Sequence, residues 1–180
     1  MGELSSSQKQ SVITLIHKKD KDRLFLENWR PISLLNTDYK ILSKVLTNRL
    51  HDVMPLLVNI AQSGYIKGRL MGDSVRTLID IIEHCQINNQ NGIMMMVDFS
   101  KAFDSLEWSF LFKTLQKMNF GESFIKWVHV LYTNVESCIL NNGLTSKHFQ
   151  LQRGVRQGDP LSAYLFILCI EVLNSMLINN

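Results

Sequence analysis

The feature that most constrains the fold is an unbroken apolar run that ends at an acid. Residues 93–97 are all apolar, and Asp98 follows them directly. Five successive apolar residues are typical of a central strand buried on both faces of a sheet. A carboxylate at the mouth of such a strand is costly to desolvate unless it faces water or a cation. Asp98 could cap the next turn or serve as an oxygen ligand for Mg²⁺, and the run alone leaves both interpretations open.

The pattern around this run mixes strands and helices, which indicates an α+β fold. Strands are predicted at 12–16, 29–35 and 93–98, with a hairpin of 136–140 and 147–151. Helices are predicted from the N-cap Asn36 to about Met54, from Asp73 onward, at 107–118 and 122–133, and from Asp159 to about Leu177.

Two of these helices carry apolar patterns that predict where they pack. The helix from Asp73 has a stripe of Val75, Leu78, Ile79 and Ile82 at helical spacing, which we expect to face the core. The last helix opens with Asp-Pro, a favourable helix start, and is apolar for most of its length. We expect it to pack across the strand at 93–98.

Composition and charge exclude several classes of protein. Hydrophobic residues make up 46% of the 180, too many for a disordered tail. No run of 18 apolar residues predicts a membrane span, and the N-terminus lacks the apolar core of a secretory signal. Three widely spaced cysteines support neither a disulfide framework nor a zinc site. The net charge of +3 is concentrated in the first 80 residues, which fits a phosphate-rich partner.

A glycine-containing loop precedes the last helix. Residues 152–159 read Gln-Arg-Gly-Val-Arg-Gln-Gly-Asp, with two glycines and two arginines before a helix N-terminus. Such a loop lets the backbone approach a charged ligand closely. The same glycines could simply make turns, and the spacing does not decide between the two.

Four ordered blocks carry a resemblance to a known family. They are NWRPISLLNTDYKILSKVLTNRL, AQSGYIKGR, VDFSKAFDSLEW and RQGDPLSAYLF. In this order they resemble the reverse transcriptase domain of non-LTR (LINE-type) retrotransposons, in which the first two are finger blocks and the others are motif A and motif B. The resemblance covers nearly the whole chain.

The resemblance implies a right-hand polymerase fold. Residues 1–90 would be fingers and 91–180 part of the palm, a ferredoxin-like (RRM-like) sheet with helices on one face. The family's motif C, an Asp-Asp pair, has no counterpart, because the sequence contains no Asp-Asp dipeptide. We therefore expect an incomplete domain, without motif C and thumb, that is inactive alone and prone to associate.

The resemblance also implies roles for individual residues. Asp98 would be catalytic and bind metal with help from the Phe99 carbonyl, with two Mg²⁺ ions expected only in a full-length parent. Asp104 belongs to the same block, and we expect a structural hydrogen bond from it. The implied nucleotide-binding residues are Arg30, Lys40, Phe103, Gln157 and Gly158. The implied nucleic-acid contacts are Lys44, Arg49, Lys67, Arg69 and Arg156, although a solvated basic face would explain Lys44, Arg49, Lys67 and Arg69 equally.

The implied function is RNA-directed DNA synthesis, with an RNA template, a DNA primer and deoxynucleoside triphosphates as partners. No membrane or obligate protein partner is inferred, and the family implies an intracellular location, in the cytoplasm, the nucleus or both. The alternatives are a non-catalytic remnant that binds nucleic acid through its basic half, or a functionless relic.

Overall fold

The structure, a computed structural model, describes residues 2–179 as a mixed α/β fold with a five-stranded sheet. The strands are β1 Gln10–His17, β2 Trp29–Leu35, β3 Glu136–Asn141, β4 Leu144–Thr145 and β5 Phe149–Gln150. The helices are α1 Ser6–Lys9, η1 Leu26–Asn28, α2 Thr37–His51, α3 Met54–Leu57, α4 Met71–Ile87, α5 Ala102–Ser105, α6 Trp108–Lys117, α7 Glu122–Tyr132 and α8 Ser162–Ile178. None of the helices in this part of the chain is long and apolar enough to cross a membrane.

The sheet is built around β1. It pairs antiparallel with β2, from Ser11 opposite Leu35 to His17 opposite Trp29, and parallel with β3. β3 in turn pairs antiparallel with β4 and β5. Asn142 and Gly143 turn the β3–β4 hairpin with positive φ angles, which suits the Asn-Gly sequence. The strands predicted at 12–16 and 29–35 are thus confirmed, whereas the predicted second hairpin strand at 147–151 is replaced by two short strands, β4 and β5.

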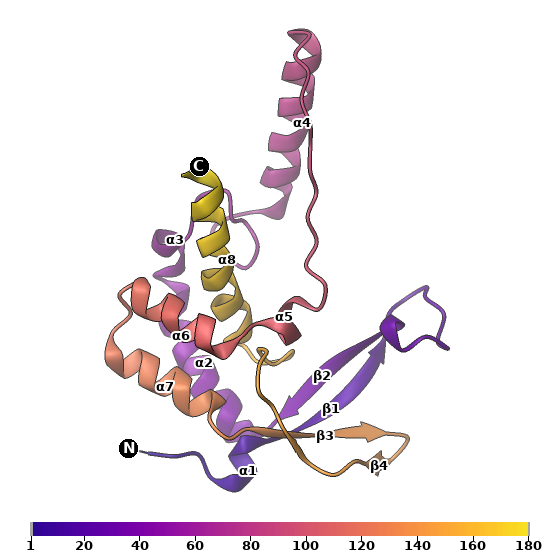
Figure 1. The fold of residues 1–180 in the computed structure, drawn as a ribbon, viewed down its shortest axis with the longest axis vertical. Coiled ribbons are helices and arrows are strands. Elements are labelled where there is room, and N and C mark those ends of the chain that lie inside the picture. Colours follow the sequence, from indigo (N-terminus) through magenta and orange to yellow (C-terminus); the bar gives the residue numbers. More distant parts are fainter. Residues whose placement is uncertain (1, 180) are drawn as a thin grey trace.

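The hydrophobic core lies among α2, α6, α7 and α8, which gather in one body at the end of the sheet (Figure 1). The side chains of Tyr39, Leu111, Leu131 and Leu165, one from each helix, are fully buried there. The helices predicted at 107–118 and 122–133 are confirmed, because α6 and α7 occupy those positions.

α2 begins at the predicted N-cap but ends earlier than predicted. The Asn36 side chain accepts a hydrogen bond from the Asp38 backbone N–H at 2.9 Å, as expected of an N-cap. The helix ends at His51, three residues earlier than predicted, and Met54 opens the separate α3 with Pro55 in its first turn. Pro is tolerated in a first turn because its missing N–H has no partner there.

The prediction of a buried central strand at 93–98 is wrong. Residues 91–99 form neither helix nor strand, and their side chains are exposed, with Ile93 entirely so. A central strand needs neighbours that satisfy its backbone N–H and C=O groups, and a cover on both faces. The strands within residues 2–179 pair with one another and not with this segment, so its apolar side chains stay in solvent.

The packing predicted for two helices is also wrong. α4 exists, but none of its residues is buried, and its stripe of Val75, Ile79 and Ile82 is exposed. Figure 1 shows α4 pointing away from the body of the molecule, with the chain returning from its far end in extended form. α8 starts at Ser162, not at Asp159, and packs against α6 instead of a strand at 93–98.

We expect core and surface leucines of α8 to differ sharply in their effect on stability. Leu165→Ala removes a fully buried side chain and should lower the free energy of unfolding by about 2–5 kcal/mol. Leu177→Ala, on the exposed end of the same helix, should change it by less than about 0.5 kcal/mol. Urea denaturation of both variants checks this, and equal effects would mean that α8 does not pack as described.

We also expect the 180-residue chain to self-associate through its exposed apolar surface. Met95→Glu places a charge in the exposed segment and should shift the chain toward monomer by size-exclusion chromatography with light scattering. Asn91→Glu is the matched control, because it adds the same charge at an exposed polar position of that segment. If both variants behave alike, charge and not apolar exposure governs the association.

Candidate functional site

The loop of residues 154–159, hereafter the 154–159 loop, joins two separate parts of the chain. Its first residues bind the α5 region, since Gly154 N–H donates to the Leu106 carbonyl and Val155 N–H to the Phe103 carbonyl, both at 2.7 Å. Further along, the Gln157 carbonyl accepts from Ser33 N–H of β2 at 2.8 Å. The loop therefore bridges the motif A region and the sheet.

Both glycines of this loop are required by close backbone contacts. Gly154 is buried with φ of 87°, and a Cβ there would lie 3.0 Å from the Asp104 carbonyl oxygen. Gly158 has φ of 102°, and a Cβ there would lie 3.2 Å from the Ser33 carbonyl oxygen. Side chains are disfavoured by the dihedral angles as well as by the space. The glycines thus do more than make turns, because they bring the backbone against two other segments.

The motif A region packs on α8 through aromatic rings. Phe166 makes edge contacts with Phe103 and Phe99, at centroid distances of 5.3 and 6.1 Å. The Trp108 indole N–H donates to the Gly154 carbonyl at 2.8 Å, which ties the start of α6 to the loop. Asp98 is linked to this assembly through its neighbour Phe99 and is itself exposed.

Asp104 is held by the same loop. Partial desolvation raises the pKa of the Asp104 carboxyl above its usual value, and a hydrogen bond with the Gln157 side chain acts in the opposite direction. This contact agrees with the structural hydrogen bond expected of Asp104, and it brings Gln157 next to the segment that carries Phe103.

The structure thus unites part of the predicted nucleotide site. Phe103, Gln157 and Gly158 meet where the loop crosses α5 and β2, and Arg30 lies exposed on β2, three residues before Ser33. That Asp98 shares one concavity with them stays a prediction.

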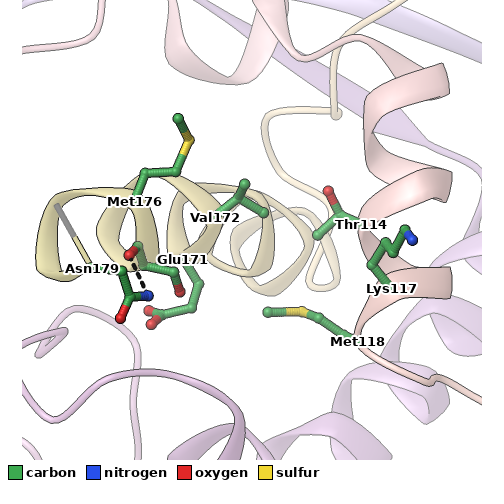
Figure 2. Close-up of a pocket in the computed structure, with 8 residues that line it drawn as sticks. Thr114, Lys117, Met118, Glu171, Val172, Met176 and Asn179 are labelled. Atoms are coloured by element: carbon green, nitrogen blue, oxygen red, sulfur yellow. Dashed lines mark hydrogen bonds between the residues drawn. The ribbon is translucent and has the colours of Figure 1, made fainter.

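Two hollows among the described residues lie away from this loop. One, of about 500 Å³, is lined by the end of α6 and the second half of α8, among them Met118, Glu171 and Met176 (Figure 2). Another lies between the β1–β2 connection and the β3–β4 turn, beside Trp29 and Asn142. Neither contains a residue that the sequence assigned to the site.

The residues implied to contact nucleic acid divide into two groups. Lys44 and Arg49 are exposed on α2, as Lys40 is, and can meet a polyanion. Lys67 is exposed but donates to Asp52 at 3.2 Å, and this hydrogen bond lowers the pKa of Asp52.

Arg69 and Arg156 are engaged inside the protein, against expectation. The Arg69 guanidinium donates to backbone carbonyls, including those of Pro55 at 2.9 Å and Gln62 at 2.8 Å, and so closes the loop before α4. Arg156 is buried, with its guanidinium carbon 4.6 Å from the centre of the Tyr39 ring. A side chain used to satisfy interior groups is not presented to a nucleic acid, so this structure does not support direct contact by either arginine.

The sequence reasoning missed a buried polar group behind the loop. Ser43 of α2 donates its hydroxyl hydrogen to the Asp159 carboxylate, and both side chains are buried. The only signal was a serine at i+4 from Tyr39, on the apolar face of α2, where a polar group requires a partner. Burial raises the pKa of Asp159, while the hydrogen bond from Ser43 acts in the opposite direction.

We expect Asp159 to make the folding stability pH-dependent. Because its pKa is raised in the folded chain, its contribution is present below the ordinary value of 3.8 and lost as pH rises through the folded value. The free energy of unfolding of the natural chain should therefore fall, relative to Asp159→Asn, as the pH rises above 3.8. Urea denaturation of both chains across that range measures the difference, and a difference independent of pH would contradict it.

Comparisons with known proteins identify the family of the chain. Residues 16–180 match the family model described as reverse transcriptase (RNA-dependent DNA polymerase). An uncharacterized 149 kDa protein of transposon TX1 from Xenopus laevis is 36% identical over 170 residues, which cover 94% of this chain and 13% of that protein. A retrovirus-related Pol polyprotein of the type-1 retrotransposable element R2 from Popillia japonica is 28% identical over 163 residues, which cover 89% and 22%.

A third relative also comes from a retrotransposable element. The Pol polyprotein of the type-2 retrotransposable element R2DM from Drosophila melanogaster is 29% identical over 148 residues, which cover 82% of this chain and 14% of that protein. The chain thus spans between 13% and 22% of the length of these three relatives. Since the family model matches nearly all of the chain and the relatives come from such elements, the chain belongs to the reverse transcriptase family of non-LTR retrotransposons.

Proposed function

We propose that this chain is the fingers and first part of the palm of an RNA-directed DNA polymerase. The observation that carries the proposal is the 154–159 loop, which holds Gln157 and Gly158 between the motif A region and the strand that bears Arg30. Residues 1–90 are the fingers in this proposal and 91–180 the palm segment. An arrangement of this kind gives an incoming nucleotide a backbone wall on one side and basic side chains on the other.

The proposed nucleotide contacts come from the loop and α5 on one side and from basic residues of β2 and α2 on the other. Gln157 and Gly158 line the pocket, and Phe103, half-buried against Phe166, blocks a ribose 2′-hydroxyl. Arg30 and Lys40, both exposed, supply counter-charge for the triphosphate. Fixing the ring of Phe103 by an aromatic neighbour suits this role, because a steric block has to be rigid to select between ribose and deoxyribose.

The described residues do not by themselves make a two-metal centre. Among residues 2–179 no group of three or more His, Cys, Asp or Glu side chains could hold a metal ion. Asp98 is the carboxylate that we propose as a ligand, together with the Phe99 carbonyl and Mg²⁺ as the ion. Two metals need several carboxylates to hold and neutralise them, so further ligands have to come from a longer parent chain.

The proposed nucleic-acid partners are an RNA template and a DNA primer. Lys44 lies one helical turn after Lys40 on α2, so the two side chains share a face, and Arg49 extends the exposed basic surface. Contacts of this kind act on the phosphate backbone and are independent of sequence. The proposed compartments are the cytoplasm and the nucleus, where such an element would meet its RNA and its target DNA.

One observation favours a second candidate function for the chain on its own. Lys40, Lys44 and Arg49 are exposed while the segment next to Asp98 is unpaired and in solvent. Exposed basic residues beside an unpaired segment fit a non-catalytic remnant that binds nucleic acid. Two results together would identify this alternative: salt-dependent binding of single-stranded RNA, and no DNA synthesis by any chain that contains these residues.

We expect DNA synthesis to depend on Asp98. In the longest natural protein that contains these residues, Asp98→Ala should reduce primer extension on an RNA template by about a thousandfold or more, because it removes a ligand of the reacting centre. Asp80→Ala is the matched control, since Asp80 is an exposed carboxylate on α4 that pairs with Arg76 at 2.9 Å. Equal rates for the natural protein and Asp98→Ala would contradict the proposed function.

The 180-residue chain alone should give no extension product in the same assay. The reason is the missing set of carboxylates, and not the loss of Asp98. Asp98-dependent synthesis by the 180-residue chain would show that its own residues suffice.

A further inference from the structure

We propose that Ser43, on α2, is a positioning residue for the nucleotide pocket, acting through Asp159 on Gln157 and Gly158. The proposal rests on the proposed function for its catalytic consequence, but its structural part concerns the 154–159 loop alone. Ser43 belongs to the finger block of the sequence, 114 residues before Gln157, and no role follows for it from the sequence motifs.

The contact between Ser43 and Asp159 is at the centre of this arrangement. Ser43 is entirely buried and Asp159 is 6% exposed. Besides the Ser43 hydroxyl, one Asp159 oxygen accepts from Leu161 N–H and the other from the Ser162 hydroxyl, both at 3.4 Å. One carboxylate thus connects α2 to the end of the loop and the start of α8. A carboxylate this deeply buried depends on its donors, because water cannot replace them.

Arg156 provides a second anchor on the same helix. Its guanidinium lies over the Tyr39 ring, one turn before Ser43, and one nitrogen donates to the Lys9 carbonyl at 3.4 Å. The Nε and Nη1 atoms of Arg156 are buried and have no hydrogen-bond partner within the described chain. The aromatic face of Tyr39 accompanies this positive charge, and the Asp159 carboxylate interacts with it electrostatically.

The residues between these anchors are the ones proposed to line the pocket. Arg156 and Asp159 point inward to α2, and Gln157 and Gly158 lie between them on the outer side. Only a few contacts hold the outer pair directly: Gln157 with Asp104 and Ser33, and Gly158 against the Ser33 carbonyl. Because the chain is anchored immediately before and after this pair, a shift of Asp159 moves Gly158 relative to β2.

Such a shift should affect nucleotide use by a polymerase more than it affects the free energy of unfolding of the chain. A small displacement of groups that position a substrate lowers kcat/KM while the fold keeps nearly all of its stability. Loss of one hydroxyl on α2 leaves the apolar core of the helix unchanged. The expected signature of Ser43→Ala is therefore a local loosening of the loop with little global unfolding.

Hydrogen exchange measured by mass spectrometry on the 180-residue chain tests the structural part. The amides of Gly154, Val155, Asp159 and Ser162 are hydrogen-bonded and so report on the loop. In Ser43→Ala, peptides covering 154–162 should exchange about tenfold faster, the scale of one hydrogen bond to a charged group. Peptides from α6 and α7 should be unchanged. Unchanged exchange at 154–162, or an equal increase everywhere, would overturn the proposal.

Two further variants make the result specific. Thr47→Val is the matched control, because Thr47 is also buried on α2 and donates its hydroxyl hydrogen to the Ser43 carbonyl of its own helix. It should leave exchange at 154–162 unaltered, and an equal effect would overturn the role of Ser43.

In Asp159→Asn, adding Ser43→Ala should change exchange much less than it does in the natural chain, since the two residues act through one contact. Additive effects of the two substitutions on hydrogen exchange would overturn the proposal that Ser43 acts through Asp159.

The catalytic consequence has its own measurement. In a polymerase-active parent protein, Ser43→Ala should raise KM for deoxynucleoside triphosphate about tenfold and change kcat less than about twofold, because the loop binds the nucleotide and does not react. Thr47→Val should change neither. Faster local exchange in a protein without Asp98-dependent synthesis would mean that the proposed function fails while the anchor stands. Unchanged KM in an active Ser43→Ala protein would overturn the positioning role.

Discussion

Close contact between the backbone of the 154–159 loop and two distant segments is the constraint on which the candidate site depends. A side chain at Gly154 would press on the Asp104 carbonyl and one at Gly158 on the Ser33 carbonyl, and both positions have positive φ angles that favour glycine. Backbone hydrogen bonds at both places fix the distance. The sheet, α5 and the start of α8 are thereby held in one arrangement, and every residue proposed to bind nucleotide is placed relative to this loop.

Apolar side chains and buried charged groups together support the 154–159 loop from the interior. Apolar side chains from α2, α6, α7 and α8 fill the core, yet Arg156 and Asp159 are buried beside them. Burying a charge is costly unless another charge and suitable donors accompany it. Here Tyr39 and Ser43 of α2 supply the aromatic face and the hydroxyl. α2 is therefore joined to the 154–159 loop by polar contacts as well as by packing.

The side of the molecule that carries α4 and residues 91–99 has few buried side chains. α4 has no buried residue, and the segment of residues 91–99 has neither hydrogen-bonded neighbours in a sheet nor cover. An apolar strand is stable only where its backbone groups are paired and its faces are packed. The same residues that suggest a central strand thus form a continuous exposed apolar stretch that leads to Asp98.

Local signals in the sequence determined the parts of the fold that depend on near neighbours. Asn36 caps α2, Asn142-Gly143 turns the hairpin, and helical spacing located α6 and α7, because capping and turn geometry act over a few residues. Four ordered blocks also sufficed to identify the family. Tertiary structure decided what depends on distant partners: whether 93–98 has a strand beside it, whether α4 has a core to face, and whether a basic side chain is exposed like Lys44 or buried like Arg156. Burial and strand pairing are properties of the assembled chain, and apolar pattern alone predicts a need for partners without supplying them.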